Sequence, residues 1–331
     1  MARKVRWGVL STARIGLQKV IPAMQQCEHG EIVAIASRNF DAAQKAAAHL
    51  GIPKAYGSYE GLLADIEIDA IYNPTPNHLH VPWSIKALEA GKHVLCEKPI
   101  ALNAEEAQLL LQAAQAHPHL KVMEGFMYRH HPQWQRAREL AQSGQIGTVK
   151  TMHCFFSFFN ADPINTRNQA ELGGGALLDI GCYAVAMPRF IFGAEPQRVC
   201  ALRELDPKFK TDRLISGMLD FGHSTSTFTC STQLLRAQTA SIHGTAGRLE
   251  IEIPLNPPFE QPSRIFHHRD DGVNEIAFAP CNQFTIQGDL FNQAILNDTP
   301  APTPLEDAVA NMKALDALAE SARKQSWVEI K

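Results

Sequence analysis

The order of apolar segments predicts an α/β chain of two domains, a doubly wound parallel sheet followed by an α+β domain with an open, mostly antiparallel sheet. Residues 5–124 alternate between short apolar strands and helical segments, the pattern of a parallel sheet covered by helices. From Thr148 onward strand follows strand, which favours antiparallel pairing. Because 331 residues exceed the usual single core, we expect a domain of residues 1–124 and a second of residues 125–331.

The first domain has the pattern of a Rossmann-type dinucleotide-binding unit. We expect strands at residues 5–10, 31–37, 69–72, 93–97 and 121–124, and helices at 14–24, 42–50, 79–90 and 104–116. In such a sheet, ligands bind outside the carboxyl ends of the strands.

The second domain is expected to build an open sheet that needs a cover on each face. Its expected strands are 149–160, 197–205, 214–221, 225–233, 238–244 and 247–253, and its expected helices are 133–143, 177–192, 283–297 and 305–324. Helices can cover one face.

Composition excludes some classes of partner. A formal net charge of −3, with no basic cluster among aromatics, argues against nucleic acid. Seven scattered cysteines without a Cys-x-x-Cys pair fit a reducing compartment. The N-terminal apolar stretch is interrupted at Ser11, Thr12 and Arg14, and no apolar run is expected to approach membrane-spanning length. We therefore expect a cytoplasmic protein with no membrane partner.

A phosphate-binding turn is expected after the first strand, although of the G-x-G-x-x-G glycines only Gly16 is present. Small residues still let backbone N–H groups face a pyrophosphate, provided that neither Ser11 nor Ala13 needs a positive φ. An ordinary strand-to-helix turn is the alternative. The expected cofactor contacts are Ser11, Thr12, Ala13, Arg14 and Ile15.

The end of the second strand predicts the choice of cofactor. It reads Ser37-Arg38, with no carboxylate to repel a 2′-phosphate and with an arginine fork suited to bind one. NADP(H) is therefore preferred, and NAD(H) remains possible. The alternative is that Arg38 only caps the turn or is solvated.

The loop after the third expected strand, residues 72–80, is rigid because it holds two prolines and two asparagines. Asn77 is suited to be the N-cap of the next helix. His78 and His80 would not share a helix face and have no third ligand at a recognisable spacing, so we expect no metal here.

Lys98 follows an apolar strand in Cys96-Glu97-Lys98-Pro99. Pro99 disfavours a helical Lys98 and so directs its side chain toward the ligand edge of the sheet. A solvated lysine is the alternative.

A further chemical set lies in residues 173–183, where Asp179 and Tyr183 are four residues apart and so share one helix face. The glycines 173–175 would let the backbone approach a ligand closely. Lysine, carboxylate and phenol form a plausible proton-transfer set, against the alternative of a helix N-terminal acid and a half-buried aromatic ring.

These two segments, Glu97-Lys98-Pro99 and Asp179-Ile180-Gly181-Cys182-Tyr183, resemble the Gfo/Idh/MocA family of nicotinamide-dependent oxidoreductases over residues 5–327. The segment 179–183 is similar to the branch of dihydrodiol dehydrogenase, NADP-dependent xylose dehydrogenase, glucose-fructose oxidoreductase and anhydrofructose reductase. Much of the wider family has histidine where Tyr183 stands.

The resemblance implies further contacts and partners. The loop over the cofactor would supply Pro74, Thr75, Asn77 and His78, next to Glu97 and Lys98. Arg129 or His130 would line the substrate pocket. Arg167 would anchor a substrate hydroxyl or a cofactor phosphate, or else clip its own loop to the domain. Another subunit would close the open sheet, giving a homodimer or homotetramer.

The implied chemistry is hydride exchange between nicotinamide and a sugar, a sugar-derived ketone or aldehyde, or a cyclic diol. Tyr183 is the expected acid/base, with an ordinary pKa of ~10 that the Lys98 ammonium would lower. Asp179 would orient Lys98 or a substrate hydroxyl. The alternatives are a non-catalytic dinucleotide sensor on the same fold and a glycosidase that uses NAD in redox-assisted elimination.

Overall fold

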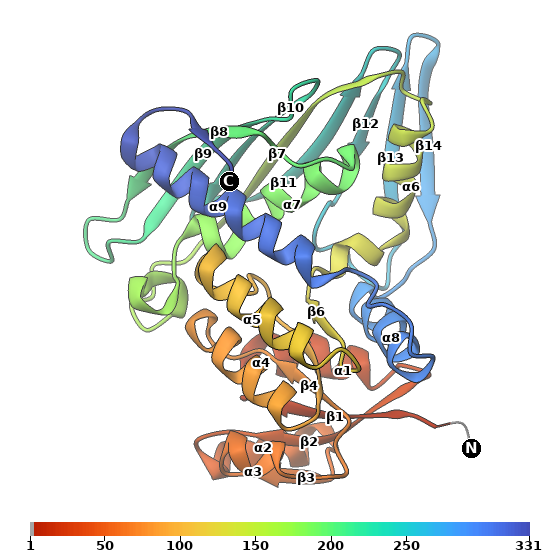
Figure 1. Cartoon of the computed structure of the whole chain (residues 1–331). Helices are drawn as coiled ribbons and strands as arrows, with labels where there is room; N and C mark the ends of the chain where they lie inside the picture. The colour runs from red at the N-terminus through yellow and green to blue at the C-terminus, as the bar shows by residue number, and fades with distance from the viewer. Residues whose placement is uncertain (1–2) are drawn as a thin grey trace. The chain divides into compact units, whose positions relative to one another are not determined.

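The computed structural model describes residues 3–331, which form two compact units (Figure 1). The first unit runs to Met127 and also takes in Asn282–Val309, and the second comprises Tyr128–Cys281 with Ala310–Lys331. Residues 282–309 were expected in the second domain. They join the first because Trp7 needs a cover: its indole N–H donates to Asn292 at 2.8 Å, and its ring packs 5.9 Å from that of Phe291.

The sheet of the first unit confirms the doubly wound prediction. Its order is β3-β2-β1-β4-β5-β6, and every neighbouring pair is parallel. The strands are β1 (Val5–Leu10), β2 (Gly30–Ala36), β3 (Lys54–Tyr56), β4 (Ala70–Asn73), β5 (His93–Cys96) and β6 (Val122–Glu124). The three-residue edge strand β3 was not expected, because it is too short to show periodicity.

The helices of the first unit are α1 (Ile21–Met24), α2 (Phe40–Leu50), α3 (Tyr59–Leu63), α4 (His80–Glu89), α5 (Ala104–Ala116) and α8 (Gln283–Leu296). A π-helical segment, Gly16–Val20, precedes α1. Asn77 is not the N-cap of α4: a 3₁₀ turn, Asn77–Leu79, comes first, and the N-cap is Leu79, which makes no side-chain capping bond.

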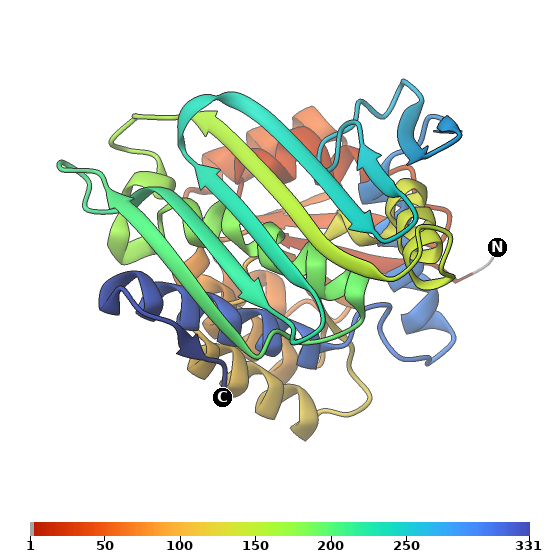
Figure 2. The same cartoon turned by 90° about the horizontal axis from the view of Figure 1, so that it is seen from above.

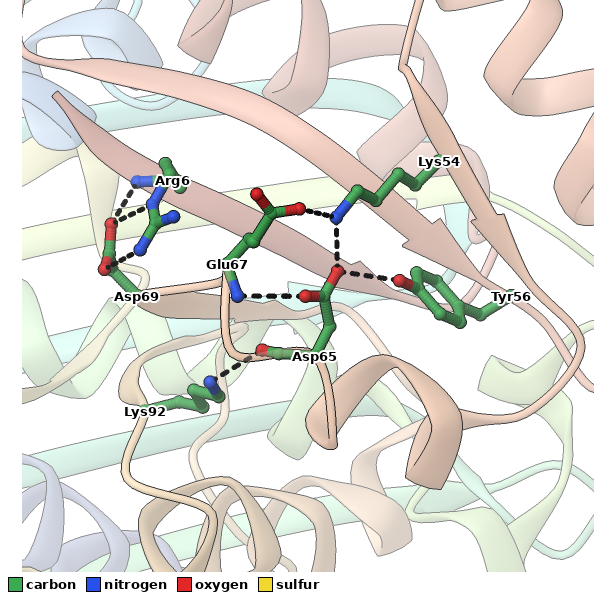
Figure 3. Close-up of polar contacts among 7 residues, drawn as sticks. All are labelled: Arg6, Lys54, Tyr56, Asp65, Glu67, Asp69 and Lys92. Carbon is green, nitrogen blue, oxygen red and sulfur yellow. Dashed lines mark hydrogen bonds and ion pairs between the residues drawn. The ribbon is translucent and has the colours of Figure 1, made fainter.

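Charged side chains join the amino ends of these strands (Figure 3). The guanidinium of Arg6 donates to both carboxylate oxygens of Asp69, at 3.0 and 2.9 Å. Lys54 lies between Asp65, at 2.7 Å, and Glu67. The Lys92 ammonium donates to the main-chain oxygens of Asp65 and Ile68, at 2.8 and 2.7 Å. This set lies at the opposite edge of the sheet from the ligand edge.

The sheet of the second unit is open and mostly antiparallel, as expected. Its order is β14-β13-β12-β11-β7-β10-β9-β8-β15, and only the pair β7 and β10 is parallel. The strands are β7 (Val149–Phe159), β8 (Arg198–Leu205), β9 (Asp212–Asp220), β10 (Thr225–Ser231), β11 (Gln233–Gly244), β12 (Arg248–Ile251), β13 (Ser263–Arg269), β14 (Gly272–Phe278) and β15 (Val328–Glu329). Figure 2 shows this sheet from above, with α7 behind it. Strands β13, β14 and β15 were not expected.

The helices that lie wholly or mainly in the second unit are α6 (Pro132–Gln142), α7 (Cys182–Phe192) and α9 (Leu305–Lys324). The helix expected over 177–192 is divided, because Leu177–Gly181 is π-helical and α7 begins only at Cys182. By length and composition, residues 170–192 could span a membrane, since an 18-residue window within them has a mean hydropathy of 1.4, so the expectation of no such run is wrong. However, 78% of that window is buried inside the protein, where α7 forms the core of the unit.

Candidate active site

The turn after β1 differs from the expectation at its first residue. Ser11 has a φ of 79°, the left-handed conformation that usually calls for glycine. Its hydroxyl donates to the Pro74 carbonyl at 3.2 Å and accepts from the Ala13 N–H at 3.1 Å. These two bonds hold a conformation that costs a non-glycine residue about 1–2 kcal/mol. The condition set for this turn is therefore met at Ala13 and not at Ser11, which takes the positive φ without being glycine.

The other residues of this turn are accessible. Thr12 and Ala13 are half-buried, the helix begins at Arg14, and Arg14 and Ile15 are exposed. The side chain of Arg14 donates to Gln18 at 2.8 Å. Small side chains at an accessible helix start fit the backbone N–H cradle that a dinucleotide pyrophosphate needs.

The end of β2 presents an arginine to solvent. Ser37 is buried, and its hydroxyl accepts from the Asn39 N–H at 3.2 Å. Asn39, and not Arg38, caps α2, since its side chain accepts from the Ala42 N–H at 3.1 Å. Arg38 is exposed. Burial raises the pKa of the Tyr59 hydroxyl, and the positive charge of Arg38 opposes that rise. Arg38 is therefore not the N-cap of α2, and its exposure agrees with the alternative of a solvated arginine.

The loop after β4 is held by a buried polar network. Thr75 donates its hydroxyl hydrogen to Asn73 Oδ1 at 2.7 Å, and Asn73 Nδ2 donates to the His80 carbonyl at 3.0 Å. Pro74, Asn77 and His78 belong to the same loop, with Asn77 and His78 half-buried in the 3₁₀ turn. Among residues 3–331, no group of three or more His, Cys, Asp or Glu side chains is placed to hold a metal ion.

Lys98 is half-buried just after β5, and its peptide bond to Pro99 is cis. The chain is fixed on both sides of it. Glu97 donates its N–H to the Asn73 carbonyl at 3.1 Å, and its carboxylate accepts from the Tyr72 hydroxyl at 2.8 Å. On the other side, the Ile100 N–H donates to the Glu124 carboxylate at 2.7 Å.

In the second unit, Asp179 forms an ion pair with Arg167. The Nε of Arg167 donates to Asp179 Oδ2 at 2.7 Å, and the Asp179 side chain is only 12% exposed. The negative charge of Asp179, and to a smaller degree Tyr183, raises the pKa of the Arg167 guanidinium. Arg167 thus clips its loop to the domain and also places a positive charge beside the two expected proton-transfer groups.

Tyr183 lies in an aromatic cluster in the first turn of α7. Its ring packs edge-on against Tyr128, with centroids 5.8 Å apart, and against Phe156 at 6.3 Å. The residue is 6% exposed. Asp179 lies in the π-helical segment, so the two residues are not related by the regular α-helical spacing that was expected.

Gly174 and Gly175 lie against other groups of the protein itself. A Cβ on Gly174 would lie 2.6 Å from the Arg167 carbonyl, and one on Gly175 would lie 2.1 Å from Asp212. Gly175 also has a φ of 115°. The close approach that we expected toward a ligand is therefore needed for the loop itself. Asp212 accepts from the Leu177 N–H at 2.7 Å, and burial raises its pKa to about 6.

Arg129 and His130 are packed inside the second unit. Arg129 is 6% exposed, and its guanidinium lies 5.7 Å from the ring centre of Phe190. Burial, helped by the charge of Arg129, lowers the pKa of His130 to about 4. His131 is the N-cap of α6, where its Nδ1 accepts from the Gln133 N–H at 3.1 Å.

Sequence reasoning gave no role to Tyr72, Glu124 and Asp212. Tyr72 donates to the Glu97 carboxylate, and Glu124 and Asp212 accept from the main-chain N–H groups of Ile100 and Leu177. The available signal was their position. Tyr72 and Glu124 are polar residues near the carboxyl ends of buried strands, where such a side chain needs a partner.

A parallel sheet in this order defines a dinucleotide-binding unit, and its carboxyl edge carries Arg38 and Lys98. The sequence comparisons agree with that class. Residues 5–126 match the family described as "Oxidoreductase family, NAD-binding Rossmann fold", and residues 134–250 match "GFO/IDH/MocA C-terminal domain". The chain belongs to the Gfo/Idh/MocA family and is an NAD(P)-dependent oxidoreductase.

Three relatives represent the similarity. The chain is 38% identical to D-xylose 1-dehydrogenase (NADP(+)) 2 of Haloferax volcanii, over 98% of this chain and 99% of the relative. It is 36% identical to trans-1,2-dihydrobenzene-1,2-diol dehydrogenase of Xenopus laevis, over 74% of each. The solved 3-ketoreductase KijD10 of Actinomadura kijaniata, in complex with NADP and TDP-benzene, superposes with a TM-score of 0.91 at 29% identity, over 96% of this chain and 98% of that one.

Proposed function

We propose that this protein transfers hydride between NADP(H) and a sugar, a sugar-derived ketone or aldehyde, or a cyclic diol. The observation that carries the proposal is the buried Tyr183 phenol in a cluster where Arg167 and Asp179 form an ion pair. A phenol beside fixed charges is suited to exchange a proton with a substrate oxygen. The named activities of the xylose dehydrogenase, the dihydrodiol dehydrogenase and the ketoreductase support this range of substrates.

The cofactor contacts that we propose follow the carboxyl edge of the first sheet. The turn Ser11–Ile15 would hold the pyrophosphate, and Arg38 with Ser37 would hold the 2′-phosphate. Arg38 is exposed and no acidic side chain directly follows β2, which favours NADP(H) over NAD(H). Pro74, Thr75, Asn77, His78 and Glu97 complete the proposed contacts. The bound nicotinamide supplies or accepts the hydride, which leaves the proton to the protein.

Proton transfer is assigned to Tyr183 and its charged neighbours. In the reducing direction the Tyr183 hydroxyl gives its proton to the carbonyl oxygen of the substrate, and in the oxidising direction the phenolate takes it back. Cations favour the phenolate, and each unit of pKa is about 1.4 kcal/mol. We assign this role to Arg167 and to the Lys98 ammonium, which would also polarise the substrate oxygen. Asp179 holds Arg167, and Arg129 and His130 are proposed to shape the substrate pocket.

A tyrosine pair tests this assignment. Tyr183→Phe should lower kcat by about 10²–10⁴-fold, because it removes the proton donor and leaves the ring. Tyr128→Phe changes a neighbouring buried tyrosine and should have a far smaller effect. Turnover is followed by NADPH absorbance with aldoses, keto sugars and cyclic diols, and NADPH binding is followed by fluorescence titration. Full activity in Tyr183→Phe would refute the mechanism, and cofactor binding without turnover of any of these substrates would refute the function.

A self-association surface is also proposed, on the nine-stranded sheet. A cavity of about 580 Å³ opens among residues of β7, β8, β9 and β10 and the C-terminal segment. Of the residues that line it, Leu202 is 69% exposed and Trp327 is 44% exposed. We propose that another copy of the chain covers this face, as a homodimer or homotetramer, and light scattering of the purified protein would measure the mass.

All seven cysteines are free thiols, which supports a cytoplasmic location.

A further inference from the structure

His80 has two main-chain contacts that the proposed mechanism does not use. It is the first residue of α4 and is 1% exposed. Its Nδ1 lies 2.7 Å from the Pro99 carbonyl oxygen, and its Nε2 lies 2.7 Å from the Thr75 carbonyl oxygen. One buried ring therefore contacts the loop after β4 and the segment after β5.

The ring has little freedom to move. Asn73 Nδ2 donates to the His80 carbonyl at 3.0 Å and to the Ser84 hydroxyl at 3.1 Å. Asn73 Oδ1 accepts the Thr75 hydroxyl hydrogen at 2.7 Å. The backbone of His80 is thus tied to the same loop that its ring contacts. A ring held at both ends transmits the position of one loop to the other.

The protonation of the ring limits how the two contacts are made. Both partners are carbonyl oxygens, which accept, so both contacts together need two ring N–H groups, and only the imidazolium has both. Burial, with a smaller contribution from the Lys98 ammonium, lowers the pKa of His80 to about 4. The two carbonyl contacts act against this shift, because each favours an N–H on the ring nitrogen that it touches.

The two carbonyls belong to segments with proposed roles. Pro99 directly follows Lys98, and Thr75 lies in the turn proposed to contact the cofactor. We propose that His80 is a positioning residue that fixes the Lys98 segment and the Thr75 loop relative to each other. This inference rests on the proposed function, because it gives His80 its effect through Lys98 and through the cofactor loop.

Two substitutions separate the contacts. The amide nitrogen of asparagine can replace Nδ1 as a donor, and that of glutamine can replace Nε2. His80→Asn should keep the Pro99 contact and lose the Thr75 contact, so that NADPH binding weakens about tenfold while kcat changes little. His80→Gln should keep the Thr75 contact and lose the Pro99 contact, so that kcat falls about tenfold while NADPH binding changes little.

A matched control reports on packing alone. Ser84→Ala removes a partner of Asn73 in the same network but leaves both ring contacts of His80. It should therefore lower the melting temperature without changing kcat and the NADPH dissociation constant to different extents. If the two His80 variants change kcat and NADPH binding in the same proportion, or change stability alone, His80 is a packing residue and the proposal is wrong.

The design keeps this result apart from the proposed function. Fluorescence titration of His80→Asn with NADPH needs no turnover, so it tests the Thr75 contact even if the role of Lys98 is wrong. A Lys98→Met enzyme that keeps full activity would refute the proposed role of Lys98, and NADPH binding without turnover of any substrate would refute the proposed function, whatever the His80 variants do. Each arm uses its own variant, so one that fails to fold leaves the other arm able to refute the proposal.

Discussion

The two edges of the six-stranded sheet are built from different interactions. At the amino edge, carboxylates and cations pair with one another, as Arg6 does with Asp69 and Lys54 with Asp65 and Glu67 (Figure 3). At the carboxyl edge, a hydroxyl and an imidazole contact main-chain oxygens: Ser11 the Pro74 carbonyl, and His80 the Thr75 and Pro99 carbonyls. Lys92 is the exception at the amino edge, since its ammonium donates to the main-chain oxygens of Asp65 and Ile68.

This difference indicates at which edge the orientation of side chains and loops matters for function. Partly exposed ion pairs are screened and contribute little to stability, and a shift of an ångström costs them little. Buried hydrogen bonds to the main chain are directional and leave a polar group unsatisfied when they break. We therefore expect substitutions at the amino edge to change stability modestly, and substitutions at the carboxyl edge to change catalysis or cofactor binding.

The largest contrast is expected between two lysines. Lys98→Met should lower kcat by about 10²–10⁴-fold, because it removes the proposed cation of the proton transfer while keeping a side chain of similar length. Lys54→Met, at the amino edge, should keep kcat nearly unchanged, since its ion pairs with Asp65 and Glu67 are partly exposed. Steady-state kinetics and thermal melts of both variants measure this contrast, and a catalytic loss of similar size in both would abolish the distinction between the edges.

Two arginines give the next contrast. Arg38→Ala should reduce the preference for NADPH over NADH by about 10–100-fold, which corresponds to the loss of a charge-assisted hydrogen bond. Arg6→Ala should leave that preference unchanged and lower the melting temperature slightly, because it removes the Asp69 pair. Dissociation constants for both cofactors come from fluorescence titration. An unaltered preference in Arg38→Ala would remove Arg38 from the proposed cofactor site.

The smallest effect concerns acid stability, since each edge also holds a histidine with a depressed pKa. Burial lowers the pKa of His93, at the amino edge, and of His80 to about 4, against about 6.5 in an unfolded chain. Between these values the unfolded state binds more protons, so the free energy of unfolding falls as pH falls from 6.5 to 4. Each histidine contributes at most about 1.4 kcal/mol per pH unit.

His93→Asn tests this slope away from the ligand edge. The asparagine oxygen can still accept the Lys121 N–H, which His93 Nδ1 accepts at 2.9 Å, so the fold should persist. The fall in stability on acidification, followed by urea unfolding at pH 7 and pH 5, should become shallower while kcat stays near that of the wild type. Asp212 acts in the opposite direction, since its raised pKa of about 6 favours the folded state on acidification in both proteins. An unchanged slope would show that His93 does not titrate as described.

Local pattern and chain order predicted most of the fold. Helix α5 and helix α9 have the expected bounds, and so does β1, because long periodic segments and clear turn residues mark them. The short strand β3 has too few residues for a pattern, and the π-helical segment Leu177–Gly181 reads as part of an ordinary helix until its packing is seen.

The residues proposed for chemistry could be selected from the sequence, but their partners could not. Spacing and residue type singled out Lys98, Asp179 and Tyr183. The ion pair of Asp179 with Arg167 joins residues twelve positions apart across a loop, and the contact of His80 with Pro99 joins the segments that follow two adjacent strands of the sheet. Such contacts depend on three-dimensional packing, which the periodicity of a segment does not record.

By itself, the sequence determined the order of strands and helices, the class of fold and the chemical groups at the ends of the strands. Hydrophobic periodicity and turn chemistry are local properties, so they are legible one segment at a time. The tertiary structure alone decided that Ser11 takes a left-handed backbone, that Gly174 and Gly175 lie against the loop's own carbonyls and Asp212, and that α8 covers Trp7. Those outcomes depend on contacts between residues that are far apart in the sequence, because in a close-packed interior the conformation of each group is restricted by its neighbours.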